Sequence, residues 1–532
     1  MDIGTIDYFI LSIYLVLMVV LAFLTSKDLK GLSGHFLAGK NSGWFLVGTS
    51  LFISTVSSEH VMGYADSGYA EGFAAGNFAW GACLVTILMA WFFVPILLRN
   101  NLLTMPEYIE KRFDVKSRLL LSGLSIIVYI ITKISITLFA GALLLEGILG
   151  WDKYTSSLIL VLLTGIFTIA GGFRGTLYTH VFHAYVVIFC ASIVVIVSIF
   201  NIGGMDALVK GIPSGHFHPF KNNTDVNYPW LGILLGAPIL EIWYWCTDQF
   251  MMQRVLSAKD VPNARRGAIY SGYLMFLVPF LLLTPGLVAL VKFGPEAVAG
   301  KTYLSVINEL LPTGVKALAV ISLLSALISS LAATFNSTAT LFTLDVYTRL
   351  YPKVEEFKIV TMGKLATLVL VTLGIVWVSF TGYFSENIIK HLQAVQSYIA
   401  PPFAAVFLVG MIWKRATANA CFSALVVGTV IGIFRIVLDL FQSSISQDSV
   451  FYYLIEINFL YEAFFMFWFY VVLMIIVSIF GEKPDRLHND NLVYSSDKTF
   501  SMEKNGQRTI DIYLSIFLIA LLIITWTILM LK

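Results

Sequence analysis

Residues 48–60 read GTSLFISTVSSEH, inside an apolar run that extends from about 44 to 65 and is long enough to cross a bilayer. A continuous helix that faces lipid would not carry so many hydroxyl groups, an acid (Glu59) and an imidazole (His60). Serine and threonine side chains can bond backbone groups that are freed where a membrane helix breaks. The stretch therefore predicts a discontinuous membrane helix whose free carbonyl groups line a cavity.

The composition of the whole chain agrees with a membrane setting. Hydrophobic residues make up 58% and charged residues 12% of 532 residues, and the mean hydropathy is +0.83. A soluble protein needs about 25% charged residues, so aqueous enzymes, nucleic-acid binders and disordered chains are excluded. The net charge of +2 gives no field for a polyanion. We expect an all-α integral membrane protein in a lipid bilayer, with no nucleic-acid partner.

The four cysteines lie inside apolar runs and have no metal-ligand spacing, so we expect no cofactor and no resident metal other than a coupling ion. We also find no nucleophile–base pair and no phosphate-binding loop, which argues against an enzyme.

Fourteen apolar runs have spanning length, and the first has no signal-peptide features. They are 6–25, 44–65, 76–98, 118–148, 154–172, 179–201, 229–252, 267–291, 313–346, 359–381, 386–412, 417–439, 450–480 and 509–531. With the N-terminus outside, 23 Lys and Arg residues fall in inner segments and 6 in outer segments. This asymmetry predicts a multi-pass protein of the plasma membrane, such as a bacterial inner membrane, with both termini outside.

A face of the ninth run offers oxygen atoms. Ala326, Ser329 and Ser330 fall at i, i+3 and i+4 and share one side of a helix, with one carbonyl and two hydroxyl groups. Neutral oxygens of this kind bind monovalent cations, and carbonyl groups of a broken helix complete the shell. Close helix packing through small residues is the alternative. Spacing alone leaves both interpretations open.

Two further runs carry polar interruptions. Residues 241–249 read EIWYWCTDQ, and these aromatic side chains either stack on a sugar ring in a wet cavity or form an interfacial belt. In the eleventh run, Gln393 and Gln396 are cavity candidates, and Pro401-Pro402 is expected to break the helix.

Breaks at corresponding places indicate an inverted-repeat transporter with a site at the membrane midplane. We expect one polytopic domain, 1–532, with repeats at 44–201 and 229–412, preceded by the helix 6–25 and followed by three helices in 417–531.

Several motifs are specific. They are WYWCTDQ (243–249) with Gln253-Arg254, FNS (335–337) with LFTLDVY (341–347), PPFAAVF (401–407) and WKR (413–415). With these residues the chain resembles the sodium/solute symporter family, in its sodium/glucose cotransporter-like branch. The resemblance implies a LeuT-like fold of five plus five inverted helices, with one helix before and three after, which makes 14.

The resemblance also assigns sites. Its sodium site falls on the carbonyl groups of Ile53, Val56 and Ala326 and the hydroxyl groups of Ser329 and Ser330. Its sugar-site or gate positions fall on His60, Tyr244, Trp245 and Gln393, with Tyr244 as the inner gate, Tyr64, Phe78 and Ile389 as the outer gate, and Gln396 at another substrate-facing position.

Three departures concern the solute. The family's sugar-binding glutamate is Ala79 here, its sugar-binding lysine is Met275, and a neutral polar position is Glu241. We therefore expect a polar solute whose hydroxyl pattern differs from that of glucose or galactose.

A fourth departure concerns the ions. His180 stands where many relatives have an aspartate that serves sodium release or a second site, and Ala332 lacks a hydroxyl group that two-sodium relatives have. An imidazole is a poor sodium ligand, so we expect one sodium ion per solute.

The predicted function is sodium-coupled import of a sugar or sugar-like polar solute by alternating access. The alternatives are symport of a sugar acid or another organic anion, such as a uronate or sialic acid, and a solute sensor that does not transport. Glu241 argues against an anion, whereas Lys133 and Lys390 keep it open. The oligomeric state stays open.

Overall fold

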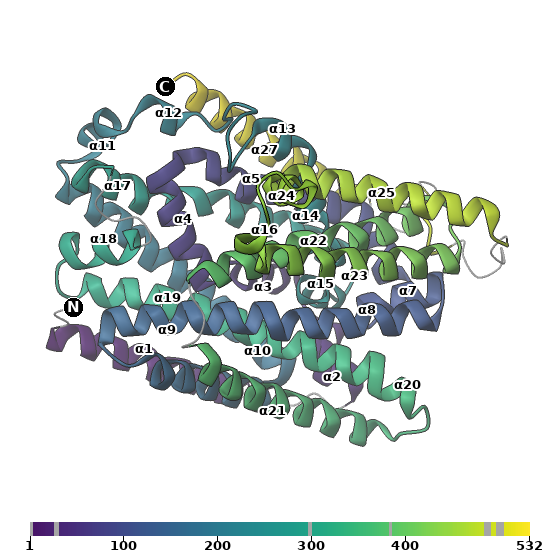
Figure 1. The fold of residues 1–532 in the computed structure, drawn as a ribbon. Helices are drawn as coiled ribbons and strands as arrows, with labels where there is room; N and C mark the ends of the chain where they lie inside the picture. Colours follow the sequence, from purple (N-terminus) through teal and green to yellow (C-terminus); the bar gives the residue numbers. More distant parts are fainter. Residues whose placement is uncertain (1–3, 26–30, 296–300, 382–385, 483–490, 496–504) are drawn as a thin grey trace.

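The protein is a bundle of helices, most of whose long members lie along roughly one axis (Figure 1). The computed structural model describes residues 4–25, 31–295, 301–381, 386–482, 491–495 and 505–532. In these ranges there is no β-strand, only two isolated bridges, Ser42 with Ala258 and Lys221 with Pro229. The expectation of an all-α protein is confirmed for this part of the chain.

The helices up to residue 201 are α1 (Thr5–Thr25), α2 (Leu32–Leu37), α3 (Trp44–Thr55), α4 (Ser58–Glu71), α5 (Asn77–Leu88), α6 (Val94–Arg99), α7 (Met105–Arg112), α8 (Val115–Val128), α9 (Ser135–Leu149) and α10 (Lys153–Asn201). The later helices are α11 (Met205–Gly211), α12 (Ser214–Phe217), α13 (Trp230–Leu235), α14 (Ala237–Glu241), α15 (Gln249–Leu256), α16 (Val261–Leu282), α17 (Thr284–Phe293), α18 (Thr302–Leu310), α19 (Val315–Thr340), α20 (Thr348–Leu350), α21 (Glu356–Thr381), α22 (Glu386–Ile412), α23 (Ala418–Leu440), α24 (Val450–Glu456), α25 (Phe459–Phe480) and α27 (Asn505–Met530).

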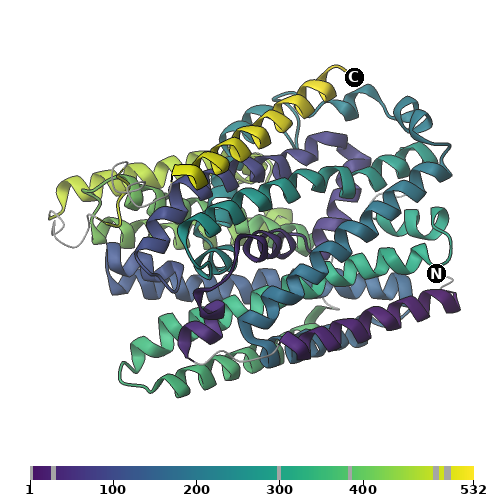
Figure 2. The same cartoon turned by 180° about the vertical axis from the view of Figure 1, so that it is seen from behind.

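Ten helical segments in the described ranges are long and apolar enough to cross a membrane. Four shorter apolar helices accompany them: Thr5–Leu21, Trp44–Thr55, Lys153–Ile169 and Ser397–Ile412. All fourteen predicted runs fall on helical segments. Figures 1 and 2 place both termini at the same end of the bundle. The protein is therefore a multi-pass membrane protein.

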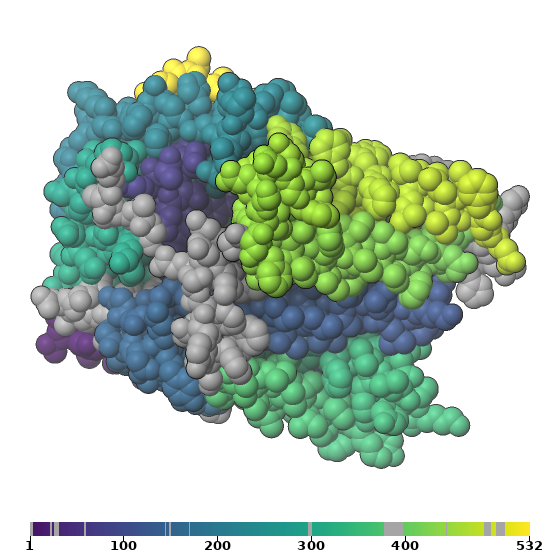
Figure 3. All heavy atoms as spheres, in the orientation of Figure 1, coloured from purple at the N-terminus to yellow at the C-terminus, as the bar shows by residue number. Residues whose placement is uncertain are grey.

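The centre of the bundle is α19, which packs against α10, α3 and α1. In its apolar window 94% of the residues are buried, against 28% in α25. Figure 3 shows α24 and α25, coloured yellow-green, at the surface, and Phe465 and Trp468 of α25 are exposed there. Large exposed apolar side chains are what a lipid-facing helix presents.

The predicted break in the second run is confirmed. α3 ends at Thr55, Val56 (ψ 97°) and Ser57 (ψ 171°) are extended, and α4 begins at Ser58. The hydroxyl group of Ser57 accepts a hydrogen bond from the backbone N–H of His60 at 3.4 Å and so caps the new helix.

The seventh run also breaks. After α14, a π-helical segment covers Ile242–Thr247, Asp248 is extended (ψ 129°), and α15 begins at Gln249. A second π-helical segment, Tyr129–Ile134, lies between α8 and α9. Wide turns of this kind interrupt the regular backbone pairing and are frequent at functional sites.

The predicted break in the eleventh run is wrong. α22 is continuous, with Pro401 and Pro402 inside it. The physical reason lies in its neighbour α23, where a Cβ added at Gly428 would be only 2.5 Å from Cβ of Pro402. Membrane helices tolerate proline where neighbours and local adjustments satisfy the freed backbone groups. The proline pair makes a close helix contact and does not end the helix.

The fifth and sixth predicted runs are two helical segments that meet at a sharp kink at Gly172 (φ +55°, ψ −161°), and the label α10 covers both. A side chain at this left-handed position would be strained, and its Cβ would lie 3.3 Å from Nδ1 of His35. The bend replaces the loop expected at 173–178, and it places His180 on a helix that packs along α19.

Candidate functional site

A cavity of about 550 Å³ lies among both broken helices. The side chains that line it come from α3 to α5, α9, α14 to α16, α19, α22 and α25, from the π-helical segments Tyr129–Ile134 and Ile242–Thr247, and from Tyr228 before α13. Seven of the residues predicted to bind or gate the solute border this one space: His60, Tyr64, Phe78, Glu241, Tyr244, Trp245 and Met275. The fold thus gathers residues that lie far apart in the chain.

Four other predicted solute or gate residues are not among the lining residues. Ala79 is buried in α5, where its neighbours Phe78 and Ala82 reach the cavity instead. Ile389, Gln393 and Gln396 belong to the first half of α22, and their side chains lie outside the described residues. Ser397, one position further along the same helix, does line the cavity.

Aromatic side chains form much of the wall. Trp245 is 1% exposed, and its ring centroid lies 5.9 Å from that of Tyr244 in an edge-on arrangement. Trp243 is also buried. Side chains of an interfacial belt would lie at the lipid surface, so the belt interpretation of this stretch is wrong. Amphipathic rings around a cavity can stack on the apolar face of a sugar or polyol.

Neutral oxygen atoms converge beside the break in the second run. The Ser329 hydroxyl oxygen lies 3.3 Å from the carbonyl oxygen of Ile53 and 2.9 Å from that of Ala326. Val56 is the buried, extended residue at which α3 ends, and Ser330 faces the cavity. All five residues predicted to bind sodium therefore lie at the contact of α3 with α19. A hard monovalent cation takes such uncharged oxygens as ligands. The same oxygens also take part in the hydrogen bonds that join the two helices, so this geometry fits both an ion site and a close helix contact.

His180 joins the two helices that carry these oxygens. Its Nε2 lies 3.2 Å from the carbonyl oxygen of Ser329 on α19, and its Nδ1 lies 2.8 Å from the Ser50 hydroxyl oxygen on α3. A carbonyl oxygen only accepts, so Nε2 carries the hydrogen and Nδ1 can accept from Ser50. The sequence marked His180 only as a departure from relatives, because periodicity within one helix does not show which other helices it touches.

A buried ion pair borders the cavity through its lysine. Nζ of Lys133, which lines the cavity, lies 2.8 Å from a carboxylate oxygen of Asp248, and both side chains are buried. The ammonium group also lies 3.7 Å from the ring centroid of Phe250, 4.8 Å from that of Tyr129 and 4.9 Å from that of Tyr244. The sequence held a signal for this pair that was not used, because Lys133 and Asp248 are opposite charges in two different apolar runs.

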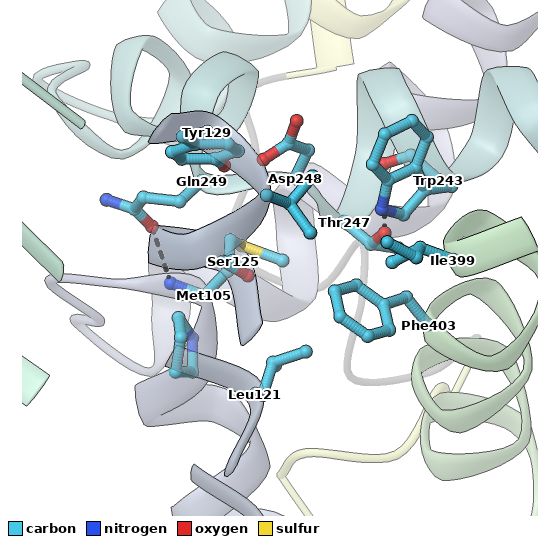
Figure 4. Close-up of a pocket in the computed structure, with 12 residues that line it drawn as sticks. Met105, Leu121, Ser125, Tyr129, Trp243, Thr247, Asp248, Gln249, Ile399 and Phe403 are labelled. Carbon is cyan, nitrogen blue, oxygen red and sulfur yellow. Dashed lines mark hydrogen bonds between the residues drawn. The ribbon is translucent and has the colours of Figure 1, made fainter. Parts of the chain in front are cut away.

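Figure 4 shows a small pocket next to this pair, which Asp248, Tyr129 and Gln249 line. The side-chain oxygen of Gln249 accepts a hydrogen bond from the backbone N–H of Met105 at 2.8 Å, which connects α15 to α7. Arg254, on the same helix α15, is fully buried over the ring of Phe250. Its guanidinium nitrogens have no hydrogen-bond partner among the described residues.

Similarity to known proteins agrees with this geometry. The profile of the "Sodium:solute symporter family" matches residues 35–428. The chain is 33% identical over 517 residues to sodium/glucose cotransporter 1 of Oryctolagus cuniculus, covering 89% of this chain and 78% of that protein. It is 31% identical over 551 residues to the sodium/myo-inositol cotransporter of Homo sapiens, covering 94% and 77%.

Solved structures show the same fold. A Na⁺-coupled sialic acid symporter in a substrate-bound outward-open state superimposes with a TM-score of 0.78 at 22% identity, over 91% of this chain and 100% of the other. A nucleobase-cation-symport-1 family transporter gives a TM-score of 0.57 at 12% identity, over 86% and 97%. At these identities the likeness concerns the fold alone. Together, the profile match over most of the chain and the curated relatives show that this chain belongs to the sodium:solute symporter family.

Proposed function

We propose that this protein imports a neutral sugar or polyol together with one sodium ion, by alternating access in a plasma membrane. The observation that carries the proposal is the shared wall of two sites. Ser329 lies among the carbonyl oxygens of Ile53 and Ala326, and the next residue, Ser330, borders the 550 Å³ cavity. An ion held on one side of this wall orders the surface that a solute meets on the other side.

The membrane topology that we propose has fourteen crossings in a single polytopic domain, 1–532. It consists of two inverted five-helix repeats, 44–201 and 229–412, with 6–25 before them and three helices in 417–531 after them. Ten long and four short apolar helices, together with two termini at one end of the bundle, support this count. The excess of Lys and Arg in alternate loops supports termini outside the cell.

In the proposed cycle, sodium bridges α3 and α19 through Ile53, Val56, Ala326, Ser329 and Ser330. The solute then enters the cavity between the outer-gate residues Tyr64, Phe78 and Ile389 and the inner gate Tyr244. It contacts His60, Trp245, Gln393, Gln396 and Glu241. Met275, which belongs to the cavity wall, and Ala79, which is buried in α5 beside the wall residue Phe78, stand where relatives have charged groups. Each ligand raises the affinity for the other by the same factor, since coupling between two binding sites is reciprocal.

The pair of Lys133 and Asp248 supports Tyr244 as the inner gate. The ammonium group lies under the Tyr244 ring and holds the break at Asp248 against α9 and its π-helical segment. Opening this side requires the ring to move away from an ammonium group that it partly shields. At one sodium per solute, about 2.3 kcal/mol per 100 mV and about 1.4 kcal/mol per tenfold sodium gradient together sustain roughly a 500-fold solute gradient.

The stoichiometry of one sodium rests on His180. Its two ring nitrogens already bond Ser50 and the carbonyl group of Ser329, so these oxygens are engaged without an ion. Beside the ring, the small pocket lined by Thr176, Thr179 and Ala332 contains no carboxylate side chain among the described residues. The place next to the proposed sodium site is thus filled by an uncharged ring.

The test is uptake into proteoliposomes that contain the purified full chain. Labelled D-glucose, D-galactose, D-mannose and myo-inositol are offered with an inward sodium gradient, or with choline in place of sodium. We expect sodium-dependent accumulation of at least one of them, and a reversal potential that fits one charge per solute. Equal uptake in choline for all four, or two charges per solute, would contradict the proposal.

A further inference from the structure

One carboxylate at the cavity has no cation beside it. Glu241 ends α14 directly before the π-helical segment, lines the cavity and is 9% exposed. Its Oε2 atom is buried and has no hydrogen-bond partner among the described residues. None of the ion pairs found among these residues includes Glu241. The Trp245 side chain forms a hydrogen bond with the same carboxyl group. The second oxygen, Oε2, still lacks a donor, and an unpaired buried carboxylate oxygen is costly.

The other charged group in the cavity wall is already neutralised. Lys133 is held by Asp248 at 2.8 Å and lies against three aromatic rings. His60, the remaining basic residue of the wall, has Nδ1 at 2.7 Å from the Ser57 hydroxyl oxygen. Among the described lining residues, Glu241 is therefore the only acidic side chain, and no basic group is in contact with it.

An ionised Glu241 suits the proposed ion site, because Ser330 borders the same cavity. A sodium ion next to Ser330 brings one positive charge to this cavity, so that the loaded cavity is neutral when the solute is neutral. An anionic solute would place a second negative charge beside Glu241 in a medium of low dielectric constant. A cationic solute would add to the charge of the sodium ion. A neutral polyhydroxy solute can instead donate adjacent hydroxyl groups to the carboxylate.

We infer that Glu241 determines the charge selectivity of this cavity, accepting hydrogen bonds from hydroxyl groups of a neutral sugar or polyol and excluding sugar acids. This inference rests on the proposed function and deepens it, because it names the residue by which the cavity selects a neutral solute over a sugar acid. Glu241 acts by contact with the solute, whereas the Lys133–Asp248 pair only removes the cation that an acid would need.

The test is a competition experiment in proteoliposomes at saturating sodium. The tracer is the best transported of labelled D-glucose, D-galactose, D-mannose and myo-inositol. The competitors are pairs that differ only at C6, where a carboxylate replaces the hydroxymethyl group: D-glucose with D-glucuronate, D-galactose with D-galacturonate, and D-mannose with D-mannuronate. For the pair whose sugar competes best, we expect the wild-type protein to bind the uronate at least 100-fold more weakly. In Glu241→Gln, the ratio of the uronate and sugar inhibition constants should fall at least tenfold.

Two matched variants control for shape. Glu241→Asp keeps the charge and should keep the wild-type ratio. Met275→Leu alters another part of the cavity wall without a change of charge and should also keep it. An unchanged ratio in Glu241→Gln, or a wild-type protein that takes a uronate as well as its sugar, would overturn the inference.

A binding measurement separates this inference from the proposed function. Quenching of tryptophan fluorescence in the purified protein, with the wall residue Trp245 as the reporter, gives the affinity for the same pairs without transport. If the Glu241→Gln variant does not transport, the ratio of its uronate and sugar dissociation constants, measured by fluorescence, tests the inference instead. If the wild-type protein shows no sodium-dependent uptake, the proposed function fails, while the fluorescence ratios still support or overturn the role of Glu241.

Discussion

The two broken helices of this protein differ in what occupies the break. At the first break, between α3 and α4, the groups in contact are uncharged: carbonyl oxygens, serine hydroxyl groups and the ring of His180. At the second break, between the π-helical segment and α15, the carboxylate of Asp248 accepts a hydrogen bond from the N–H of Phe250 at 3.2 Å and pairs with Lys133.

The difference shows that a break in a membrane helix can serve two purposes. A break with only neutral oxygens has room for an added positive charge and is suited to a mobile ion. A break that already contains an ammonium group is satisfied within the protein and is suited to holding two segments together. Four changes test this contrast.

The largest expected effect is at the charged break. Asp248→Asn leaves the ammonium group of Lys133 buried without its counter-charge, and we expect the free energy of unfolding to fall by about 3–5 kcal/mol. The double variant Lys133→Met with Asp248→Asn should lose clearly less than the sum of the two single variants. Denaturant unfolding in detergent measures the cycle, and additive losses would show that the two groups do not stabilise each other.

At the neutral break, Ser329→Ala with Ser330→Ala should leave the fold intact and weaken sodium binding. Loss of two hydroxyl ligands is expected to raise the sodium concentration for half-maximal uptake roughly 100-fold, or about 2.7 kcal/mol. The matched control is Ser322→Ala, a buried serine on the same helix whose hydroxyl group has no partner among the described residues. Undiminished sodium dependence in the double variant would refute the ion site.

His180→Asp should make the neutral break more like the charged one. A carboxylate in place of the ring gives a second cation a counter-charge, so uptake should become sigmoidal in sodium, and the charge moved per solute should rise toward two. His180→Gln, which is uncharged, should keep a hyperbolic dependence. Electrogenic uptake currents measure both quantities, and a hyperbolic curve with one charge in the aspartate variant would contradict the role of His180.

The smallest expected effect is at the cap of the first break. Ser57→Ala removes the N-cap of α4 and should lower the free energy of unfolding by about 1 kcal/mol. It also removes the hydroxyl group that contacts the His60 ring, so solute binding should weaken. Ser449→Ala removes the N-cap of α24 at the surface and should cost similar stability without altering solute affinity. Equal solute affinities in both variants would separate Ser57 from the binding site.

Much of the architecture could be predicted from local pattern. Apolar runs of spanning length fixed the positions of the helices, since each run must satisfy its backbone groups within itself in lipid. The breaks in the second and seventh runs could be predicted from their polar residues, because polar side chains inside an apolar run are costly in lipid unless they face the interior of the bundle. The break at Pro401-Pro402 was predicted wrongly, since proline chemistry is local while the facing Gly428 is not.

The site was predicted less completely, and for the same reason. Ala326, Ser329 and Ser330 share a helix face by spacing, so their grouping was visible in the sequence. The approach of Ser329 to Ile53, the bridge made by His180 and the pair of Lys133 with Asp248 each join segments more than 100 residues apart. No periodicity within one helix reports which face of a distant helix it meets.

By itself, the sequence determined that this chain crosses a membrane many times and that two of its helices are interrupted by polar residues. Those properties depend on the transfer of each segment from water to lipid, which is a sum over neighbours in the chain. Only the tertiary structure decided which charges meet. It paired Lys133 with Asp248 and left Glu241 without a cation at the cavity among the described residues, because electrostatic energy in a dry interior depends on distances between helices.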